Sequence, residues 1–449
     1  MRAFVFPGQG SQKVGMGAEL AEASATAREV FEEVDEALGQ KLSAIMREGP
    51  EDQLTLTENA QPAIMANAIA VLRVLEKEGG LSIAAKGECV AGHSLGEYTA
   101  LCAVGAFSLA DTARLLKLRG QAMQAAVPVG VGAMCALLGA DLEKAQAVAD
   151  AAAEGEVCQV ANDNDPGQVV LSGHRGAVER AVALAKDHGI KRGVILPVSA
   201  PFHCSLMQPA ADAMDEALGR TPPGPFRLPL YANVTAAAVT DPAEERRLLV
   251  EQITGRVRWR ESVIAMKEAG VARFVELGGK VVGPMIGRTV VDVSVLSVVT
   301  MADIEALVKE FEALTEARRH RDLRADIDLN ELTGTVIEEC IRIHRELGPG
   351  LLESVYETVL TGALQRRGLI VDRQVPVDIH YDGMAFPAAF RIDLLVEKVL
   401  VLEIKSVERL ANLHARQLLT YLRLTGSPLG LLLNFSCETM KEGIRRVAN

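Results

Sequence analysis

Short apolar segments alternate with longer Ala-, Leu- and Glu-rich segments along the first two thirds of the chain, and this alternation restricts the fold more than any other feature. The apolar segments predict strands at Ala3–Phe6, Glu88–Ala91, Val194–Val198, Leu228–Ala232 and Arg273–Leu277. Strands separated by helical segments favour a largely parallel sheet that is covered by helices. We therefore expect an α/β domain over residues 1–314.

A second pattern interrupts this domain. Its order of predicted elements is βαββαβ: Gly132–Leu138, a helix from Leu142, Val157–Ala161, Gln168–Ser172, a helix from Ala177, and Gly193–Leu196. This order is typical of a ferredoxin-like unit. We expect a small subdomain at about 128–197, inserted into a large subdomain formed by about 1–127 and 198–314.

A dense run of charges from Glu316 to Arg324 ends the first domain, because no hydrophobic core could absorb it. We interpret residues 315–325 as a charged linker or a solvated helix end. Beyond it, 326–449 predicts a second α/β domain, with helices at Thr333–Leu347 and Leu352–Arg367, strands between Val375 and Ile404, and a helix near Ala411–Leu424.

The charge balance argues against general binding of polyanions. The chain has 47 basic and 59 acidic residues, a net charge of −12, which disfavours non-specific attraction to nucleic acids or anionic membranes. Seven scattered cysteines form no close pair, as expected in a reducing compartment. With neither a signal peptide nor a membrane span expected in this sequence, we predict a cytoplasmic protein without a membrane partner.

The strongest local signal is Gly92-His93-Ser94-Leu95-Gly96, which lies between a predicted strand and a predicted helix. This context is typical of a nucleophile elbow, in which small residues permit the tight turn that presents a serine hydroxyl at a helix N-terminus. The best candidate for the base is His203, just after a predicted strand. We expect His93 to be structural, because a residue adjacent in sequence to the nucleophile points its own side chain away from the substrate.

Five ordered motifs resemble the malonyl-CoA:acyl carrier protein transacylase family over residues 1–314. They are Phe6-Pro7-Gly8-Gln9-Gly10-Ser11-Gln12, Gly92-His93-Ser94-Leu95-Gly96-Glu97-Tyr98, Leu118-Arg119-Gly120-Gln121-Ala122-Met123-Gln124, Asn162-Asp163-Asn164-Asp165-Pro166-Gly167-Gln168 and Ser199-Ala200-Pro201-Phe202-His203. The resemblance implies an α/β-hydrolase-like acyltransferase core, no cofactor, and transfer of malonyl from malonyl-CoA to the phosphopantetheine thiol of acyl carrier protein in fatty-acid synthesis.

The resemblance also implies a role for each site residue. Ser94 would carry the malonyl ester, and His203 would act as base and then acid, oriented by the backbone carbonyl of Gln252. Backbone N–H groups of Gln9 and Leu95 would form the oxyanion hole. Arg119 would bind the free malonyl carboxylate through a charge-assisted, bidentate pair. Acidic carrier protein would need a local basic patch, for which Lys191 with Arg192, or Arg256 with Arg258, are candidates.

A serine hydrolase or thioesterase is the alternative for this domain. Such enzymes place an acid between serine and histidine in chain order, and Asp163 and Asp165 lie in that interval. Their Asn-Asp-Asn-Asp-Pro-Gly context predicts a structural turn instead.

One departure from the transacylase pattern is Gly279, where that family usually has proline. This departure questions the rigidity of the loop rather than the chemistry.

In the second domain, Phe390–Leu395 and Leu402–Lys405 predict a hairpin around Glu397-Lys398. Because side chains alternate along a strand, Glu403 and Lys405 share a face, and Asp393 on the partner strand can join them. Two carboxylates can hold Mg²⁺, and the lysine can position a water nucleophile.

This arrangement resembles the D…(D/E)-x-K core of the restriction-endonuclease-like fold. Three further segments resemble its GxxExxY family: Gly350-Leu351-Leu352-Glu353-Ser354-Val355-Tyr356, Leu329-Asn330-Glu331-Leu332-Thr333-Gly334 and Gln417-Leu418-Leu419-Thr420-Tyr421-Leu422. Glu353 could complete the metal site. The net charge of −3 over 326–449 lacks the basic footprint of a DNA-binding nuclease. A metal-dependent nuclease and a non-catalytic interaction module both stay open, and nucleic acid is a candidate partner of this domain alone.

Overall fold

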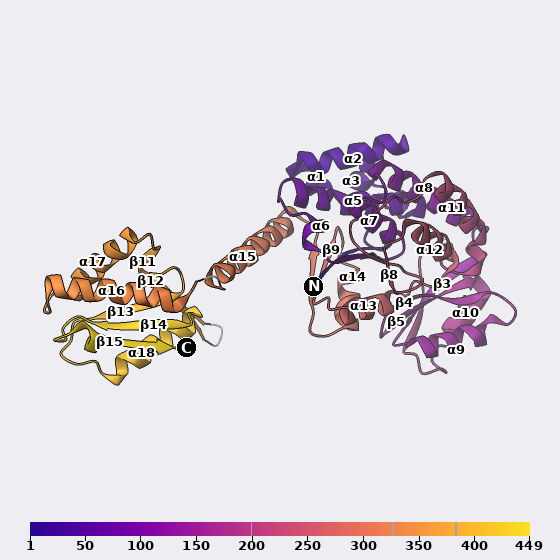
Figure 1. Cartoon of the computed structure of the whole chain (residues 1–449). Coiled ribbons are helices and arrows are strands. Elements are labelled where there is room, and N and C mark those ends of the chain that lie inside the picture. The colour runs from indigo at the N-terminus through magenta and orange to yellow at the C-terminus, as the bar shows by residue number, and fades with distance from the viewer. Residues whose placement is uncertain (199, 326, 382–383) are drawn as a thin grey trace. The chain divides into compact units, whose positions relative to one another are not determined.

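The computed structural model (Figure 1) describes residues 1–198, 200–325, 327–381 and 384–449. Ser199 of the fifth motif and Asp326, where the second domain is expected to begin, lie outside these ranges. The chain forms two compact units, Met1–Glu310 and Phe311–Asn449. Residues 315–325, the expected linker, continue the helix α15 (Met301–Ala325). Within the described ranges, no helix is long and apolar enough to span a membrane.

A six-stranded sheet organises the first unit, and its strand order is β10-β9-β1-β2-β7-β8. Its strands are β10 (Ser294–Val298), β9 (Arg273–Leu277), β1 (Arg2–Phe6), β2 (Cys89–Gly92), β7 (Leu230–Tyr231) and β8 (Ala238–Val239). All neighbours pair in parallel except β7 and β8. The predicted α/β class with a largely parallel sheet is confirmed.

Both faces of this sheet are buried, which explains why β1 is a continuous apolar run. Ala3 and Val5 join a core with residues of α13 (Trp259–Glu268) and α14 (Val282–Thr289). The alternate residues Phe4 and Phe6 are equally inaccessible to solvent. Further helices of the large subdomain are α1 (Ala18–Ala23), α2 (Ala25–Leu38), α3 (Leu42–Glu48), α4 (Glu51–Thr55), α5 (Thr57–Lys77), α6 (Ile83–Lys86), α7 (Leu95–Val104), α8 (Leu109–Ala125), α11 (Gln208–Arg220) and α12 (Pro242–Thr254), with the 3-10 turn η1 (Ser205–Met207).

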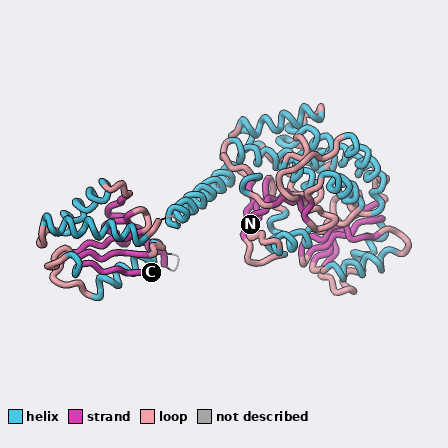
Figure 2. The backbone as a smooth tube through the Cα atoms, viewed as in Figure 1, coloured by secondary structure: helices cyan, strands magenta, loops and turns pink. Residues whose placement is uncertain are grey.

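The predicted ferredoxin-like insert is also confirmed. Its antiparallel sheet has the order β4-β5-β3-β6 and carries two helices (Figure 2). The elements are β3 (Gly132–Leu138), α9 (Leu142–Ala153), β4 (Cys158–Asp165), β5 (Gln168–His174), α10 (Arg175–Leu184) and β6 (Arg192–Ile195). The strand expected to run to Val198 ends at Ile195, because β6 pairs with β3 only from Arg192 to Ile195.

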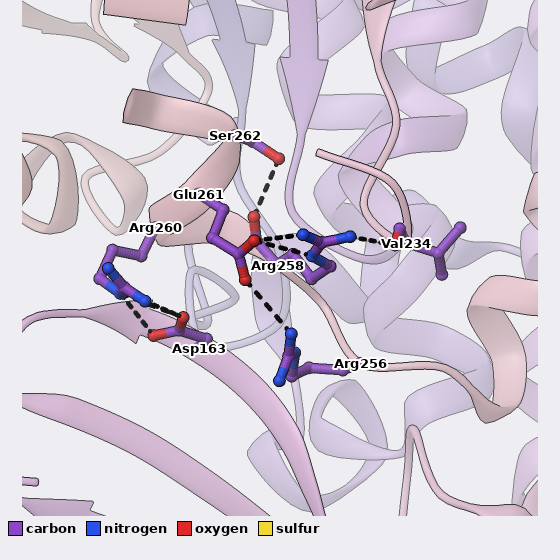
Figure 3. A network of polar contacts seen from close by, with 7 residues as sticks. All are labelled: Asp163, Val234, Arg256, Arg258, Arg260, Glu261 and Ser262. Carbon is purple, nitrogen blue, oxygen red and sulfur yellow. Dashed lines mark hydrogen bonds and ion pairs between the residues drawn. The ribbon is translucent and has the colours of Figure 1, made fainter. Parts of the chain in front are cut away.

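The small subdomain is joined to the large one by strand β4. The Asp163 N–H donates to the Val257 carbonyl (2.9 Å), and the Val257 N–H donates to the Ala161 carbonyl (2.8 Å). The buried Asp163 carboxylate pairs with Arg260 at 2.8 Å (Figure 3), and the buried Asp165 carboxylate pairs with Arg288 at 2.8 Å. The expected turn forms only at Pro166-Gly167, whereas Asp163 and Asp165 lie in strand β4, and their structural role is as expected.

We expect Asp163→Ala to destabilise the first unit by about 2–3 kcal/mol, because it removes one partner of a buried ion pair. This loss of stability is small for a buried ion pair, because the Arg260 side chain is 26% exposed and its charge can be hydrated once Asp163 is removed. Trp259 is the only tryptophan and is buried in this unit, so its fluorescence during urea unfolding reports on this unit. Asp215→Ala, which breaks the exposed pair with Arg246, is the control and should cost less than about 0.5 kcal/mol. Equal midpoints for both variants would contradict this role of Asp163.

The second unit contains a five-stranded mixed sheet of order β11-β12-β13-β14-β15. Its strands are β11 (Val371–Tyr381), β12 (Met384–Val396), β13 (Leu400–Lys405), β14 (Leu429–Asn434) and β15 (Ile444–Ala448), and its helices are α16 (Leu329–Leu347), α17 (Glu353–Arg366), α18 (Asn412–Thr425) and α19 (Met440–Gly443). The hairpin expected between β12 and β13 is present, with positive φ at Glu397 (49°) and Lys398 (58°) in its turn. The predicted second α/β domain is confirmed, although β14, β15 and α19 were not predicted.

Candidate active site

Ser94 occupies a tight turn between β2 and α7. Its backbone is strained, with φ 54° and ψ −109°. The flanking glycines permit this turn, because a Cβ at Gly92 would lie 1.9 Å from the backbone of Gly96, and one at Gly96 would lie 2.6 Å from the carbonyl of Phe6. The strand, turn and helix together hold the hydroxyl at the N-terminus of α7, as a nucleophile elbow does.

His203 lies beside this serine. Its Nε2 is 2.8 Å from Ser94 Oγ, and its Nδ1 is 2.8 Å from the backbone carbonyl of Gln252. A carbonyl can only accept, so Nδ1 carries the proton and Nε2 accepts from the serine hydroxyl. Burial, reinforced by the Arg119 charge, lowers the pKa of His203 to about 3. The imidazole is therefore neutral at physiological pH and able to take a proton.

Gln9 and Leu95 border the same space. Leu95 is the first residue of α7, and the first amides of a helix have no acceptor within the helix. Gln9 lies in the loop after β1, between Gly8 and Gly10; Gly10 has φ +107°, and a Cβ at Gly8 would lie 2.7 Å from the His93 carbonyl. Both residues line a cavity of about 400 Å³ together with Ser94 and His203.

Arg119, on α8, is 1% exposed and reaches the nucleophile. Within the part of the chain described, its guanidinium donates to Gln61 Oε1 (2.7 Å), Gln252 Oε1 (2.8 Å) and Ser94 Oγ (3.0 Å). Burial lowers its pKa, but an arginine stays charged. The cavity is thus lined by a buried cation whose hydrogen-bond partners are uncharged, which suits a carboxylate ligand.

The cavity lies between the two subdomains of the first unit. Its lining combines these polar groups with apolar side chains from both subdomains: Met123, Met134, Val170, Phe202 and Met285. A pocket with few, convergent polar groups on apolar walls is typical of a small-molecule site. Its volume admits the acyl end of a thioester.

In the second unit, Asp393 and Glu403 meet on neighbouring strands. Asp393 Oδ2 accepts the N–H of Ile404 (2.8 Å), and Glu403 Oε1 accepts from Lys405 Nζ (2.8 Å). Glu403 Oε2 is buried without a partner among the described residues. Burial, and then the Asp393 charge, raises the pKa of Glu403 to about 7, and burial also raises the pKa of Asp393.

This donor set fits a hard divalent cation, which would neutralise two crowded carboxylates and bind the orphan oxygen. Glu353 takes another partner, since its Oε1 accepts the N–H of Ser406 (3.0 Å). No group of three or more His, Cys, Asp and Glu side chains within the described ranges is arranged to hold a metal ion. Of the three expected ligands, the geometry favours Asp393 and Glu403.

A family model described as "Acyl transferase domain" matches residues 3–317. The chain belongs to the acyl transferase family. The malonyl CoA-acyl carrier protein transacylase of Bacillus subtilis (strain 168) is 45% identical over 288 residues, which are 64% of this chain and 89% of that protein. The crystal structure of the acyl-carrier-protein S-malonyltransferase from Bartonella henselae is 53% identical, with a TM-score of 0.67 over 69% of this chain and 98% of that one.

Two further comparisons concern partners and the second unit. A type II PKS malonyl-transacylase, solved in complex with its acyl-carrier protein, is 38% identical, with a TM-score of 0.66 over 69% of this chain and 99% of that one. A model of the PD-(D/E)XK nuclease superfamily matches residues 330–447. The expected resemblances to the transacylases and to the restriction-endonuclease-like fold are therefore confirmed.

Among the residues that the structure describes, the acyl transferase site contains no Ser-His-acid triad. His203 is oriented by a carbonyl, and Asp163 and Asp165 are held by arginines, so neither takes the place of a hydrolase acid. His93 has a structural position as expected, with Nε2 2.8 Å from Asn164 Oδ1 and its ring packed edge-on against Trp259.

Several residues that shape the acyl transferase site were not predicted. Asn233 accepts the N–H of Ser94 (2.7 Å) and donates to the carbonyl of Gly92 (2.7 Å), so it clamps the elbow from both sides. Gln61 holds Arg119 from α5. Neither residue lies in a motif, and only the folded chain brings them to the site.

The loop containing Gly279 is anchored by Glu276. The buried Glu276 carboxylate accepts the N–H groups of Val281 (2.8 Å), Val282 (3.0 Å) and Gly283 (2.9 Å). A Cβ at Gly279 would lie 2.7 Å from the Pro7 ring, so the glycine here permits close packing on the loop after β1. Hydrogen bonds to one carboxylate thus supply the order that a proline would otherwise provide.

Proposed function

We propose that the first unit transfers a malonyl group from malonyl-CoA to the phosphopantetheine thiol of acyl carrier protein, through a malonyl ester on Ser94, and so supplies fatty-acid synthesis. One observation carries this proposal. The hydroxyl of Ser94 contacts both a neutral histidine base and a buried arginine whose hydrogen-bond partners are uncharged. Such a site is complementary to an acyl group that ends in a carboxylate.

In the first half-reaction, Ser94 Oγ attacks the thioester carbonyl while its proton passes to Nε2 of His203. The carbonyl of Gln252 accepts from Nδ1 and stabilises the imidazolium that forms. The backbone N–H groups of Gln9 and Leu95 stabilise the negative charge on the carbonyl oxygen. The C–S bond then breaks, and the CoA thiolate takes the proton from His203.

The second half-reaction reverses these steps. The acceptor thiol gives its proton to His203, attacks the ester, and releases Ser94, which recovers its proton. Arg119 holds the malonyl carboxylate in both halves. A thiol must therefore outcompete water at the same ester, which distinguishes a transferase from a hydrolase.

The acceptor is proposed from the relatives, which include a transacylase solved with its carrier protein. Of the two basic pairs expected to bind an acidic partner, Arg256 and Arg258 both pair with Glu261 (Figure 3). Lys191 and Arg192 are exposed on the small subdomain. We therefore favour Lys191 and Arg192 for docking the carrier protein.

The experiment that tests the transferase is intact-protein mass spectrometry of the full chain after brief mixing with malonyl-CoA. We expect a malonyl adduct that persists in buffer and clears when phosphopantetheinylated carrier protein is added. An adduct that clears equally fast in buffer would mean that water is the acceptor and that the unit is a hydrolase.

We also propose the wider organisation of the protein. Residues 1–314 form an acyltransferase domain, which needs no cofactor. Residues 326–449 form a nuclease-like domain. All seven cysteines are free thiols, and four of them are buried in the first unit, which supports a reducing, cytoplasmic location.

For the second unit, the orphan oxygen of Glu403 favours a metal-dependent nuclease. Asp393 and Glu403 would hold Mg²⁺, which when bound supplies charge stabilisation at a phosphate. Lys405 lies on the same face as Glu403 and would position the attacking water. The alternative, a non-catalytic interaction module, needs none of these groups for its function.

We expect Lys405→Ala in the full chain to reduce Mg²⁺-dependent cleavage of DNA by at least about 100-fold, since the cation that positions the water is lost. Lys398→Ala is the matched control, because Lys398 lies in the turn of the same hairpin and pairs with Asp372. Cleavage is followed on labelled duplex DNA with Mg²⁺ or EDTA. A wild-type chain that binds DNA or protein without cutting DNA would favour the interaction module.

A further inference from the structure

Two buried carboxyl groups lie behind the catalytic machinery, and no step of the proposed reaction uses them. Glu97 is in the first turn of α7, three residues after Ser94, and Glu245 is on α12. Both are 0% exposed. Their side chains are within hydrogen-bonding reach of each other.

Glu97 is connected to the nucleophile. Its Oε2 accepts the backbone N–H of Asn233 (2.7 Å), the residue whose side chain clamps the elbow at Ser94 and Gly92. A shift of Glu97 would therefore move the backbone of Asn233, and with it the side-chain amide that fixes the strained backbone of Ser94.

Glu245 is connected to the base. It lies seven residues, about two helical turns, before Gln252 on α12, so both side chains are on the same face of the helix. The Gln252 carbonyl orients His203, and its side chain contacts Ser94 O (3.1 Å) and Arg119 (2.8 Å). The two carboxyl groups thus join the helix that carries the nucleophile to the helix that orients the base.

If both carboxyl groups are ionised, the pair has more hydrogen-bond acceptors than the described structure has donors for them. Glu97 Oε1 and both oxygens of Glu245 are buried without a donor in the described structure. Two adjacent carboxylates in such a place cannot both be charged at low cost. A single proton between them supplies the missing donor and leaves one negative charge near the buried Arg119.

We propose that Glu97 and Glu245 share one proton and act as a positioning pair, which holds Asn233 and Gln252, and through them Ser94 and His203, in register. This inference rests on the proposed malonyl transfer only for its activity readout. The pair touches neither substrate nor reacting atoms, so its role is in geometry.

Loss of the shared proton should uncouple the two helices. Burial raises the pKa of Glu97 to about 7 and raises the pKa of Glu245 well above its usual range. The other charged or titratable groups around the pair are Tyr98 on α7, Arg119 on α8 and Glu244 on α12. Above the pKa of Glu97 the pair keeps one proton, and only when the pH rises through the raised pKa of Glu245 does the second carboxyl ionise, so that two negative charges repel. The rate of malonylation should therefore fall at alkaline pH, and we call this fall the alkaline limb of the pH–rate profile. It is separate from the fall at acid pH that protonation of His203 causes, because the pKa of His203 is lowered.

The test measures the rate of Ser94 malonylation against pH in the full chain. In Glu245→Gln, the amide donates to Glu97 as the shared proton does but cannot ionise. We expect its rate at pH 7 to stay within about threefold of wild type, while the alkaline limb moves up by at least about one pH unit. Glu251→Gln is the matched control, because Glu251 lies on the same helix with its side chain 52% exposed, and it should leave the limb unchanged.

A second measurement does not depend on activity. Infrared difference spectra of wild type minus Glu245→Gln at pH 7 should show the C=O band of a protonated carboxylic acid, and Glu97→Gln provides the same comparison if the first variant does not fold. An alkaline limb that is identical in wild type and Glu245→Gln, or a missing band, would overturn the shared proton. Failure of the proposed function is distinguishable, because wild type would then form no malonyl adduct at any pH.

Discussion

A Ser94→Ala variant should form no malonyl adduct and should transfer malonyl groups at least about 10⁴-fold more slowly than wild type, because the covalent route is lost while binding is kept. Arg119 keeps two of its three hydrogen bonds in this variant, those to Gln61 and Gln252. The KM for malonyl-CoA should therefore change little, whereas kcat collapses. Stopped-flow release of CoA and intact-protein mass measure the two effects.

The control for this variant is Ser205→Ala, which removes an exposed hydroxyl just after His203 and should leave kcat unchanged. Persistence of the adduct in Ser94→Ala would show that another nucleophile carries the acyl group. A normal adduct on wild type without onward transfer would keep Ser94 as nucleophile and remove the proposed acceptor.

The elbow could be predicted from sequence because its chemistry is local. The glycines at 92 and 96 lie between a strand and the helix that follows it, and Gly92 is required by the backbone of Gly96 itself. His203 was located by the same logic, as a histidine in a loop at the end of a predicted strand. Gln252 came only from the family resemblance, since a backbone carbonyl leaves no signature in a sequence.

Residues that support the site from a distance could not be predicted. Asn233 and Glu245 reach the elbow from segments about 140 and 150 residues away, and no pattern in either segment indicates it. The Asn-Asp-Asn-Asp-Pro-Gly run was assigned to a turn from its composition, and the turn is confined to Pro166-Gly167. Strand pairing with β5 and neutralisation by Arg260 and Arg288 keep the buried Asp163 and Asp165 in strand β4.

The second unit shows the complementary case. The hairpin that carries Asp393, Glu403 and Lys405 follows from alternation and a turn, both of which are visible in the sequence. Strand β14, in contrast, is a fully buried apolar run without alternation, and such a run does not distinguish a strand from a buried helix. Its parallel pairing with β13 makes this segment a strand, and that pairing is a tertiary contact that the local sequence does not reveal.

An Arg119→Ala variant should lose its preference for malonyl-CoA over acetyl-CoA. Removal of a charge-assisted, bidentate contact to the malonyl carboxylate should lower kcat/KM for malonyl-CoA by about 10²- to 10³-fold. Acetyl-CoA offers no carboxylate, so its kcat/KM should fall by less than about tenfold. That smaller loss has a source in the structure, since Arg119 also donates to Ser94 Oγ, while the contact of Ser94 with His203 does not depend on Arg119.

Competition between the two thioesters in one reaction measures the ratio directly and cancels any loss of folded protein. Arg114→Ala is the matched control, because Arg114 lies on the same helix and is 58% exposed. Its malonyl-to-acetyl ratio should equal that of wild type. An equal loss with both thioesters in Arg119→Ala would assign Arg119 to holding Ser94 rather than to recognising the acyl group, and selectivity would then have to come from the apolar walls of the cavity, where Met123 and Phe202 lie.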